Sequence, residues 1–550
     1  MDEKNLIYEK ADPGAIDHGD EYVSFAIYSP GKKSVSVIAS FNGWNSQQTT
    51  LTEREPGFWV SVIKLSQGEY FYQFLIDDEI VICDPYAREI SYRNTNNEIP
   101  TAIIRINEKP FIWEHDHWPR HSLRDLIIYE MHIGDFTPEG SFNAATAQLG
   151  YLKELGINAI QLTPVCEAKD YWGYKPTYLF APWRKFGTPN ELRNFIDQAH
   201  GHDIAVILDM VVAHTAHEHP FNQMYPYEES PWYGPVLGES NQFGLPSFNF
   251  LNDATNFFVT DIARHWLLNY HVDGFRYDYL AGIGTNDERK GLPTVIGEAR
   301  KIRPHVFLIG ECIPEDADLV NDSGLSAVWH TRSRLALQTL LIETDVEPYT
   351  FDDFEEVVQV LDPKTQEYVS AEFMINYIES HDDERLLYAL QNSEFDDDLV
   401  FKKIKLAISI LMTIPGQPMI YQGQEWGEAT PNNGPKENKI QWQLKNDNLG
   451  RGITEYLKSM CKLRKTRSSF RSENFSFLTI DVQKRCIAYK REYGQGDIAI
   501  VGVNFSHEKQ TLKIPLPKNG YWHQFMKEPF YIENQFVCDL EGCGSIILLS

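Results

Sequence analysis

The sequence has few cysteines, no long apolar run and a deficit of basic residues. Its seven cysteines are scattered and none forms a Cys-x-x-Cys pair, which argues against a disulfide framework and a zinc site. No stretch approaches the length of apolar sequence that spans a membrane, and acidic residues occupy the N-terminal segment where a signal peptide needs an apolar core. Fifty basic against 78 acidic residues give a formal charge of −28, which disfavours nucleic acid and anionic membrane as partners. These absences predict a reduced, cytoplasmic protein, and no feature indicates an oligomeric state.

The first part of the chain has the pattern of an all-β module. Short segments rich in β-branched and aromatic residues are separated by Pro, Gly and Asn, including the turn signal Asn42-Gly43; they cover residues 22–28, 34–39, 58–63 and 70–76. This pattern predicts a small β-sandwich over residues 1–112. Short strand patterns return near the C-terminus and predict a second β-sandwich over residues 456–550.

The central part alternates between strand and helix patterns. A continuous apolar run at 126–133 is typical of a strand buried on both faces, and a helical pattern at 141–156 follows it. Thr188, Pro189 and Glu191 form a capping box that opens a helix over 188–200. Eight strands are predicted in all, at 126–133, 157–165, 203–214, 271–278, 305–311, 326–330, 373–383 and 416–425. The alternation predicts an α/β fold, a (β/α)₈ TIM barrel over residues 113–455, with an insertion at about 215–254 beside its active end.

Polar side chains follow several of these strands, where active sites of such barrels lie. Arg276 and Asp278 stand two residues apart, so they point to the same side of a strand. Alone, such a pair is best explained as an ion pair, and each other residue could be a turn former or a helix cap. Together they bring several carboxylates to one mouth, which suits the division between nucleophile and acid in glycoside hydrolysis. The strand-end residues are Asp209, His214, Arg276, Asp278, Glu311, His381 and Asp382.

These residues lie in segments that resemble the signature motifs of the α-amylase superfamily, glycoside hydrolase family 13. The segments are "DMVVAH" (209–214), "GFRYD" (274–278), "GE" (310–311), "ESHD" (379–382) and "WGYKPTYLFAP" (172–182). The resemblance covers nearly the whole chain. It implies that Asp278 is the nucleophile, that Glu311 is the general acid and base, and that Asp382 stabilises the transition state.

The resemblance also implies the roles of the residues that bind sugar. Tyr174 would stack beneath the sugar that is cleaved, and Arg276 would keep Asp278 ionised with support from Asp209. His214 and His381 would hydrogen-bond hydroxyl groups of the same ring. Further aromatic platforms are predicted at Trp172, Trp232 and Tyr233. No metal or other cofactor is expected, because Ala213 stands where the family usually has an asparagine that binds structural calcium.

The segment around "FNGWN" (41–45) resembles the starch-binding-type module of branching enzymes, debranching enzymes and trehalohydrolases. Trp44 could contact glucan there, or be structural. The resemblance favours a retaining hydrolase that cleaves α-1,4 bonds of starch, glycogen or maltooligosaccharides. The alternatives are a 1,4-α-glucan branching enzyme, which is a transferase, and a maltooligosyl trehalose trehalohydrolase. A chain that only binds glucan is disfavoured by the intact trio Asp278, Glu311 and Asp382.

Overall fold

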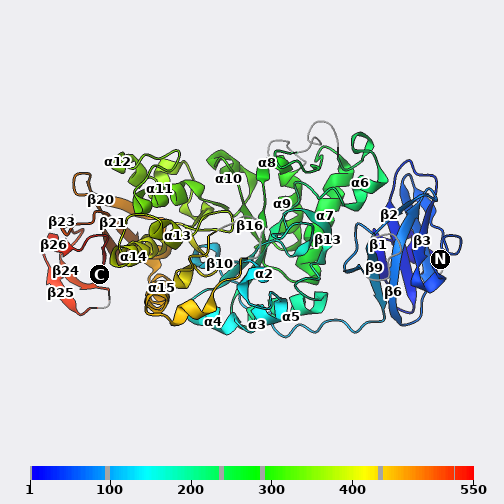
Figure 1. Cartoon of the computed structure of the whole chain (residues 1–550), viewed down its shortest axis with the longest axis horizontal. Helices are drawn as coiled ribbons and strands as arrows, with labels where there is room; N and C mark the ends of the chain where they lie inside the picture. The colour runs from blue at the N-terminus through cyan, green and yellow to red at the C-terminus, as the bar shows by residue number, and fades with distance from the viewer. Residues whose placement is uncertain (1–2, 93–98, 234–240, 285–290, 432–437, 526) are drawn as a thin grey trace.

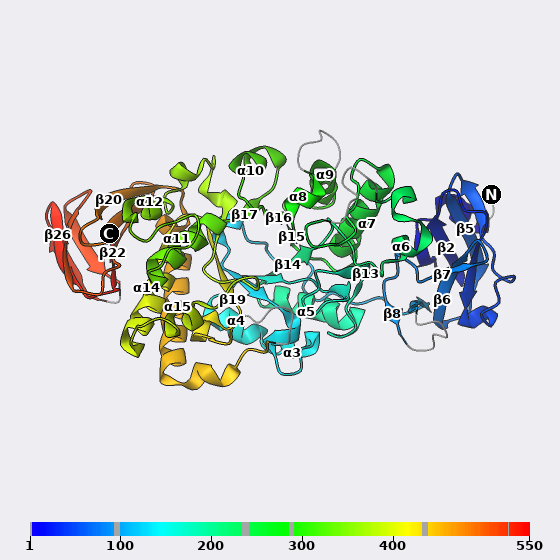
Figure 2. The same ribbon diagram turned by 45° about the horizontal axis from the view of Figure 1, so that its top comes forward.

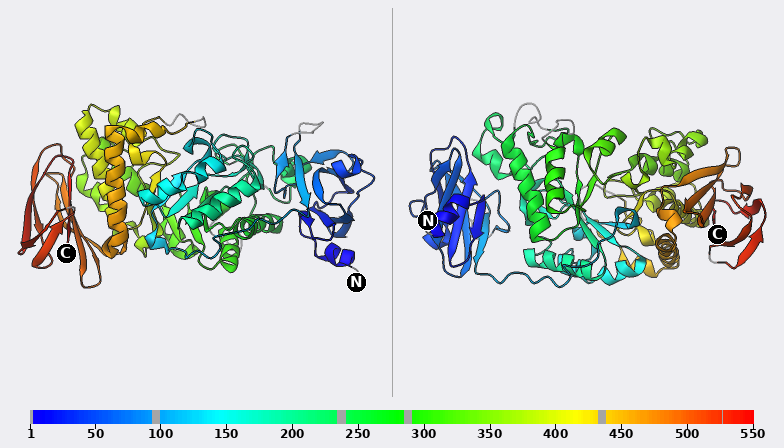
Figure 3. Two further views of the ribbon diagram at one scale, coloured as in Figure 1. Left: turned by 90° about the horizontal axis from the view of Figure 1, so that it is seen from below. Right: turned by 180° about the vertical axis from the view of Figure 1, so that it is seen from behind.

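The computed structural model describes residues 3–92, 99–233, 241–284, 291–431, 438–525 and 527–550. Three parts follow one another along the longest axis, with the N-terminal and C-terminal β-rich parts at opposite ends of a central barrel (Figures 1 and 3). Within the described residues, no helix is long and apolar enough to cross a membrane. All seven cysteines are free.

The N-terminal module contains two antiparallel sheets. After α1 (Glu3–Lys10), one sheet has the order β1 (Gly14–Asp17), β2 (Tyr22–Tyr28), β5 (Phe58–Lys64), β4 (Thr52–Glu55). The other has the order β3 (Val35–Ala39), β6 (Gly68–Ile76), β9 (Thr101–Ile106), β8 (Ile90–Ser91), with β7 (Ile80–Ile82) paired to β6. Alternate residues of β2, such as Val23 and Phe25, are buried with Val35 and Val37 of β3 in one core. The predicted sandwich is confirmed.

Eight parallel strands close into the predicted barrel (Figure 2). In chain order they are β10 (Ile128–Met131), β11 (Ala159–Leu162), β14 (Ala205–Met210), β15 (Gly274–Tyr277), β16 (Phe307–Gly310), β17 (Ala327–Trp329), β18 (Met374–Asn376) and β19 (Gln417–Tyr421). All their residues are buried, as expected of strands covered on both faces. Each of the eight predicted strands contains one of these.

Helices occupy the connections between the strands. Between β10 and β15 they are α2 (Ile133–Phe136), α3 (Phe142–Thr146), α4 (Leu149–Leu155), α5 (Pro189–Gly201), α6 (Pro220–Met224) and α7 (Asp253–Asn269), with the hairpin of β12 (Cys166–Ala168) and β13 (Pro176–Pro182). After β15 they are α8 (Leu280–Ile283), α9 (Leu292–Ile302), α10 (Ala317–Ser323), α11 (Thr331–Ile342), α12 (Phe354–Gln359), α13 (Leu386–Gln391), α14 (Asp397–Thr413) and α15 (Asn448–Thr466). The capping box of α5 forms as predicted, because Thr188 accepts from the Glu191 N–H and the Glu191 side chain accepts from the Thr188 N–H.

Two boundaries differ from the prediction. The helix expected over 141–156 is two helices, α3 and α4. Phe142 and Ala145 are buried in α3, and Leu149 and Leu152 are buried in α4, so the apolar spacing does not reveal the break between the two helices. The predicted domain boundary at 455/456 falls inside α15. This helix buries residues at helical spacing on both sides of that point, so the barrel part extends through it.

The C-terminal part is again built from two sheets. A six-stranded sheet has the order β20 (Phe475–Asp481), β21 (Cys486–Tyr493), β22 (Asp497–Asn504), β27 (Ser545–Leu549), β24 (Gly520–Gln524), β25 (Pro529–Ile532). A two-stranded sheet pairs β23 (Gln510–Pro515) with β26 (Gln535–Leu540). A separate apolar cluster that includes Leu512 and Trp522 draws side chains from both sheets.

Candidate active site

One buried arginine holds three of the predicted carboxylates together. Arg276 of β15 lies in register with Asp209 of β14, and both side chains are fully buried. Arg276 Nη1 donates to both Asp209 oxygens, at 2.7 and 2.9 Å, and to Asp278 Oδ1 at 2.9 Å. Arg276 Nη2 lies 3.0 Å from Glu311 Oε2. The pair on one strand is therefore more than an ion pair that closes the strand end, because it draws in carboxylates from both neighbouring strands.

The charges in this cluster do not cancel. Burial raises the pKa of Asp278 well above the ordinary aspartate value; Arg276 opposes this, whereas Glu311 and Asp209 add to it. Burial also raises the pKa of Asp209 against the opposing effect of Arg276. Because one cation serves several carboxylates, the cluster as a whole holds a proton more firmly than an isolated carboxyl group does.

The backbone after Asp278 helps to position Glu311. Tyr279 has a left-handed conformation with φ of 48°, and its N–H donates to Glu311 Oε2 at 3.1 Å. The short helix α8 that follows packs closely on the end of β16. A Cβ atom at Gly310 would lie 2.5 Å from Leu280 Cδ1, so a larger residue before Glu311 would require the Leu280 side chain to move.

Tyr174 and His381 form a stacked pair beside the carboxylates. Their ring centroids are 5.0 Å apart with an interplanar angle of 10°, and the Tyr174 hydroxyl donates to Asp209 Oδ2 at 2.7 Å. His381 Nδ1 lies 2.7 Å from Glu130 Oε1, and its Nε2 lies 3.2 Å from Asp382 Oδ1. Burial alone lowers the pKa of His381, but Asp382 and Glu130 raise it to about 10. His381 is therefore a cation at neutral pH.

Glu130 was missed by the sequence analysis. It is a fully buried carboxylate in β10, and it also accepts the backbone N–H of His381 at 3.1 Å. The available signal was its position, since it is a charged residue inside the apolar run at 126–133. A buried charge in such a run needs a partner, and here the partner is 251 residues away.

A cleft of about 570 Å³ opens above these groups. Its lining includes Tyr174, His214, Asp278, Glu311, Trp329, His381 and Asp382. Two further hollows share lining residues with it. One of about 470 Å³ shares Asp170, Lys175 and Leu245, and one of about 420 Å³ shares Ala281 and Ile313. The cleft therefore adjoins two further hollows at different parts of its wall.

Two predicted aromatic platforms are wrong. Trp232 is 3% exposed, and its ring stacks on Phe221 with centroids 3.6 Å apart. Tyr233 is 1% exposed and stacks on Phe248. Both are core residues of the inserted segment, where an apolar environment suits an aromatic ring as well as a sugar would.

Trp172 and His214 each contact one member of the stacked pair formed by His381 and Tyr174. Trp172 is 7% exposed and packs on His132, with its ring centroid 5.9 Å from that of His381. His214 lines the cleft, but its Nε2 donates to the Tyr174 carbonyl at 2.9 Å and its Nδ1 accepts from Asn241 at 3.1 Å. Burial lowers the pKa of His214, which keeps the ring neutral. Both ring nitrogens have protein partners, Tyr174 and Asn241, and the hydrogen bond from His214 to a sugar hydroxyl stays a prediction.

The position expected for a calcium ligand does not fit a metal ion. Ala213 has no ligand atom in its side chain, and its carbonyl accepts the Phe248 N–H at 3.1 Å. Elsewhere in the described chain, one group of three residues, Glu114, His115 and Asp197, is close enough to hold a metal ion. In that group Asp197 Oδ1 already accepts the N–H groups of Glu114 and His115, so its evident role is to fasten the linker to α5.

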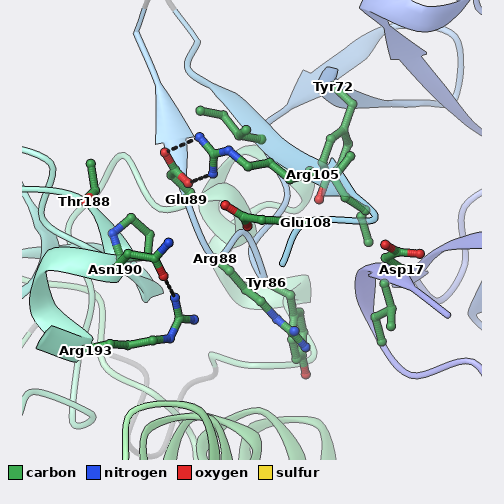
Figure 4. A pocket seen from close by; sticks show the side chains of 15 residues that line it. Asp17, Tyr72, Tyr86, Arg88, Glu89, Arg105, Glu108, Thr188, Asn190 and Arg193 are labelled. Atoms are coloured by element: carbon green, nitrogen blue, oxygen red, sulfur yellow. Dashed lines mark hydrogen bonds and ion pairs between the residues drawn. The ribbon is translucent and has the colours of Figure 1, made fainter. Parts of the chain in front are cut away.

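A second cavity, of about 410 Å³, lies between the N-terminal module and α5 (Figure 4). Two of its arginines have polar partners in the wall, Arg105 with Glu89 and Arg193 with Asn190. It shares no lining residue with the cleft and none of the carboxylates held by Arg276. It is therefore separate from the candidate active site.

An eight-stranded parallel barrel with close carboxylates at the carboxyl ends of its strands is the arrangement expected of a barrel enzyme that acts on glycosidic bonds. Comparison with known families agrees. The model "Alpha amylase, catalytic domain" matches residues 91–235 and 330–493, and the chain belongs to this family, glycoside hydrolase family 13. "Carbohydrate-binding module 48 (Isoamylase N-terminal domain)" matches residues 12–87. The chain is accordingly an enzyme that acts on α-glucans. Asp278 and Glu311 lie between the two matched catalytic segments, so their assignment depends on the motifs and the geometry.

Several characterised proteins are similar over most of the chain. A 1,4-alpha-glucan branching enzyme GlgB of Methylococcus capsulatus is 24% identical, covering 97% of this chain and 76% of that protein. A malto-oligosyltrehalose trehalohydrolase of Saccharolobus solfataricus is 26% identical, covering 75% of each. Among solved structures, pullulanase type I from Bacillus subtilis complexed with maltose has a TM-score of 0.84 at 21% identity, covering 99% of this chain and 86% of that one.

Proposed function

We propose that the protein is a retaining glycoside hydrolase that cleaves α-1,4-glucosidic bonds in starch, glycogen or maltooligosaccharides. The observation that carries the proposal is that Asp278 and Glu311 contact the same Arg276 guanidinium inside an extended cleft. Carboxylates that share one guanidinium lie close together, and close carboxylates are the arrangement of retaining enzymes. The two hollows that adjoin the cleft support a substrate with several sugar residues.

In this proposal the reaction has two steps. Asp278 attacks the anomeric carbon, the bond to the leaving oxygen breaks, and Glu311 gives that oxygen a proton. Glu311 then removes a proton from water, whose oxygen displaces Asp278 and regenerates the free enzyme. Because Asp278 is buried and has a raised pKa, the Arg276 contact is needed to keep it ionised for the attack.

The remaining groups hold the sugar ring. Tyr174 offers its ring as a platform, while its hydroxyl fixes Asp209 against Arg276. Asp382 is 58% exposed, so its carboxylate is available to sugar hydroxyl groups in the cleft. His381, held as a cation beneath Tyr174, offsets the negative charge of Asp382 and Glu130.

The test is product analysis after incubation with amylose, with Asp278→Asn as the control. A hydrolase gives short oligosaccharides and a rising count of reducing ends. The Asp278→Asn variant should lose turnover and still bind glucan, because the side chain keeps its shape and loses its negative charge. Undiminished turnover in this variant would overturn the assignment of the nucleophile.

A transferase, 1,4-α-glucan branching enzyme, is the second candidate. The similarity to branching enzymes over 97% of the chain favours it. It would form the same intermediate on Asp278 and pass the glucosyl chain to a sugar hydroxyl. The amylose experiment separates the two, since branching leaves the number of reducing ends unchanged and creates α-1,6 linkages. The similarity to a trehalohydrolase makes maltooligosyl trehalose the third substrate to test.

A further inference from the structure

The N-terminal module is in direct contact with the segment that walls the cleft. This segment, described at residues 216–233 and 241–250, belongs to the connection between β14 and α7, and α6 within it lies beside the module (Figure 2). Tyr28 at the end of β2 packs edge-on against Trp232, with ring centroids 6.0 Å apart. The Tyr225 hydroxyl donates to the Pro30 carbonyl at 2.7 Å, and Lys32 Nζ lies 4.4 Å above the Tyr225 ring.

From Trp232 the contacts continue toward the cleft. Its ring stacks on Phe221, while its carbonyl accepts the N–H of Asn249 and the hydroxyl of Thr255, both at 2.8 Å. Tyr233, the next residue, forms a β-bridge with Phe248. Tyr28 of the module is therefore linked through Trp232 to residues 241–250, which form the returning half of the segment.

The returning half is part of the cleft. The N–H of Phe248 donates to Ala213, directly before His214, and Ser247 forms a β-bridge with His214. Asn241 donates to His214 Nδ1, and His214 in turn holds the Tyr174 carbonyl. Phe243 and Leu245 line the cleft themselves.

We infer that the N-terminal module is a structural part of the active site, and that Tyr28 is a positioning residue that holds the cleft wall through Trp232. This role differs from carbohydrate binding by the module, because it acts on substrates too short to reach the module. Without the Tyr28 contact, the wall samples arrangements in which His214 and Phe243 do not face the sugar. The apparent affinity then falls in proportion to the fraction of molecules that keep the competent arrangement. Saturating substrate restores that arrangement, so kcat is preserved while KM rises.

The inference rests on the proposed function, since it requires that glucan binds in the cleft. The experiment compares wild type with Tyr28→Ala and Tyr28→Phe, using maltotetraose as a substrate confined to the cleft. Tyr28→Ala should raise KM by roughly two- to tenfold, the equivalent of one aromatic pair, with kcat unchanged. Tyr28→Phe should behave as wild type, because it retains the ring. Tyr521→Ala is the matched control, because Tyr521 is 74% exposed in the C-terminal part.

A KM for maltotetraose that is unchanged in Tyr28→Ala, with an effect confined to amylose, would show that the module acts only as a glucan tether and would overturn the inference. If Tyr28→Ala does not fold, Tyr225→Phe keeps the ring and removes the hydroxyl that donates to Pro30 in the module. This variant should raise KM in the same direction, and an unchanged KM there would also overturn the inference. Binding of maltotetraose to the Asp278→Asn protein, measured by calorimetry, separates the two proposals. No binding in that protein would overturn the proposed function and the inference together, whereas normal binding that Tyr28→Ala does not weaken would overturn the inference alone.

Discussion

Glu130 should raise the pKa of His381 together with Asp382, and the variant Glu130→Gln tests the contribution of Glu130. The side chain of Glu130 is fully buried, with His381 Nδ1 2.7 Å from one oxygen and the His381 backbone N–H 3.1 Å from the other. Glutamine keeps the shape of the side chain and one carbonyl oxygen, and it removes the negative charge. Any change in the titration of His381 therefore reports the charge rather than a cavity.

The size of the effect follows from the pKa. Burial lowers the pKa of His381, and Asp382 together with Glu130 raises it to about 10. An opposite charge at hydrogen-bonding distance moves a pKa by roughly one to three pH units, which corresponds to about 1.4–4 kcal/mol. The stability that this proton gives to the folded state is fully present below the unfolded pKa of about 6.5 and is lost as pH rises toward the folded value. In Glu130→Gln the loss should be complete at a lower pH.

Side-chain NMR of ¹⁵N-labelled histidine measures this directly, with the His381→Gln spectrum identifying the signal. We expect His381 to remain a cation through pH 9 in wild type and to titrate at a lower pH in Glu130→Gln. A wild-type midpoint near that of a free histidine would refute the reasoning. So would equal midpoints in the two proteins, because Glu130 would then contribute nothing to the charge of His381.

Two further predictions concern Tyr174 and the absence of a metal ligand at Ala213. Tyr174→Phe keeps the ring on His381 and removes the hydrogen bond to Asp209. The value of kcat/KM should fall by roughly tenfold to a hundredfold, because a hydrogen bond to a charged group contributes about that much. An unchanged kcat/KM would contradict the role given to the hydroxyl. Dialysis against EDTA should leave activity and melting temperature unchanged, because Ala213 offers no side-chain ligand; a loss that calcium alone restores would disprove this.

The residues that the sequence placed correctly are those fixed by a strand end. Arg276 and Asp278 share a face because side chains alternate along a strand, and parallel strands of a barrel bring their carboxyl ends to one rim. The link between Glu130 and His381 could not be predicted in the same way, because it depends on closure of the barrel across 251 residues. The prediction that Trp232 is a sugar platform was wrong for another reason. An aromatic ring suits a core and a sugar platform equally, and only its packing on Phe221 and Tyr28 decides between them.

In the proposed mechanism, the choice between hydrolysis and transfer depends on whether water or a sugar reaches the glucosyl–Asp278 intermediate. Two exposed apolar side chains bear on this choice. Phe243 is 57% exposed and contacts Tyr279, and Ile313 is 62% exposed two residues after Glu311; both line the cleft. A sugar acceptor that covers them removes apolar surface from water, whereas a water molecule does not. Phe243→Ser should therefore disfavour a sugar acceptor by about 1 kcal/mol, which is roughly a fivefold change. The measurement is the ratio of new reducing ends to new linkages formed from amylose. A ratio that does not change in Phe243→Ser would mean that acceptor choice is made elsewhere in the cleft, since the steps up to the intermediate are common to both reactions.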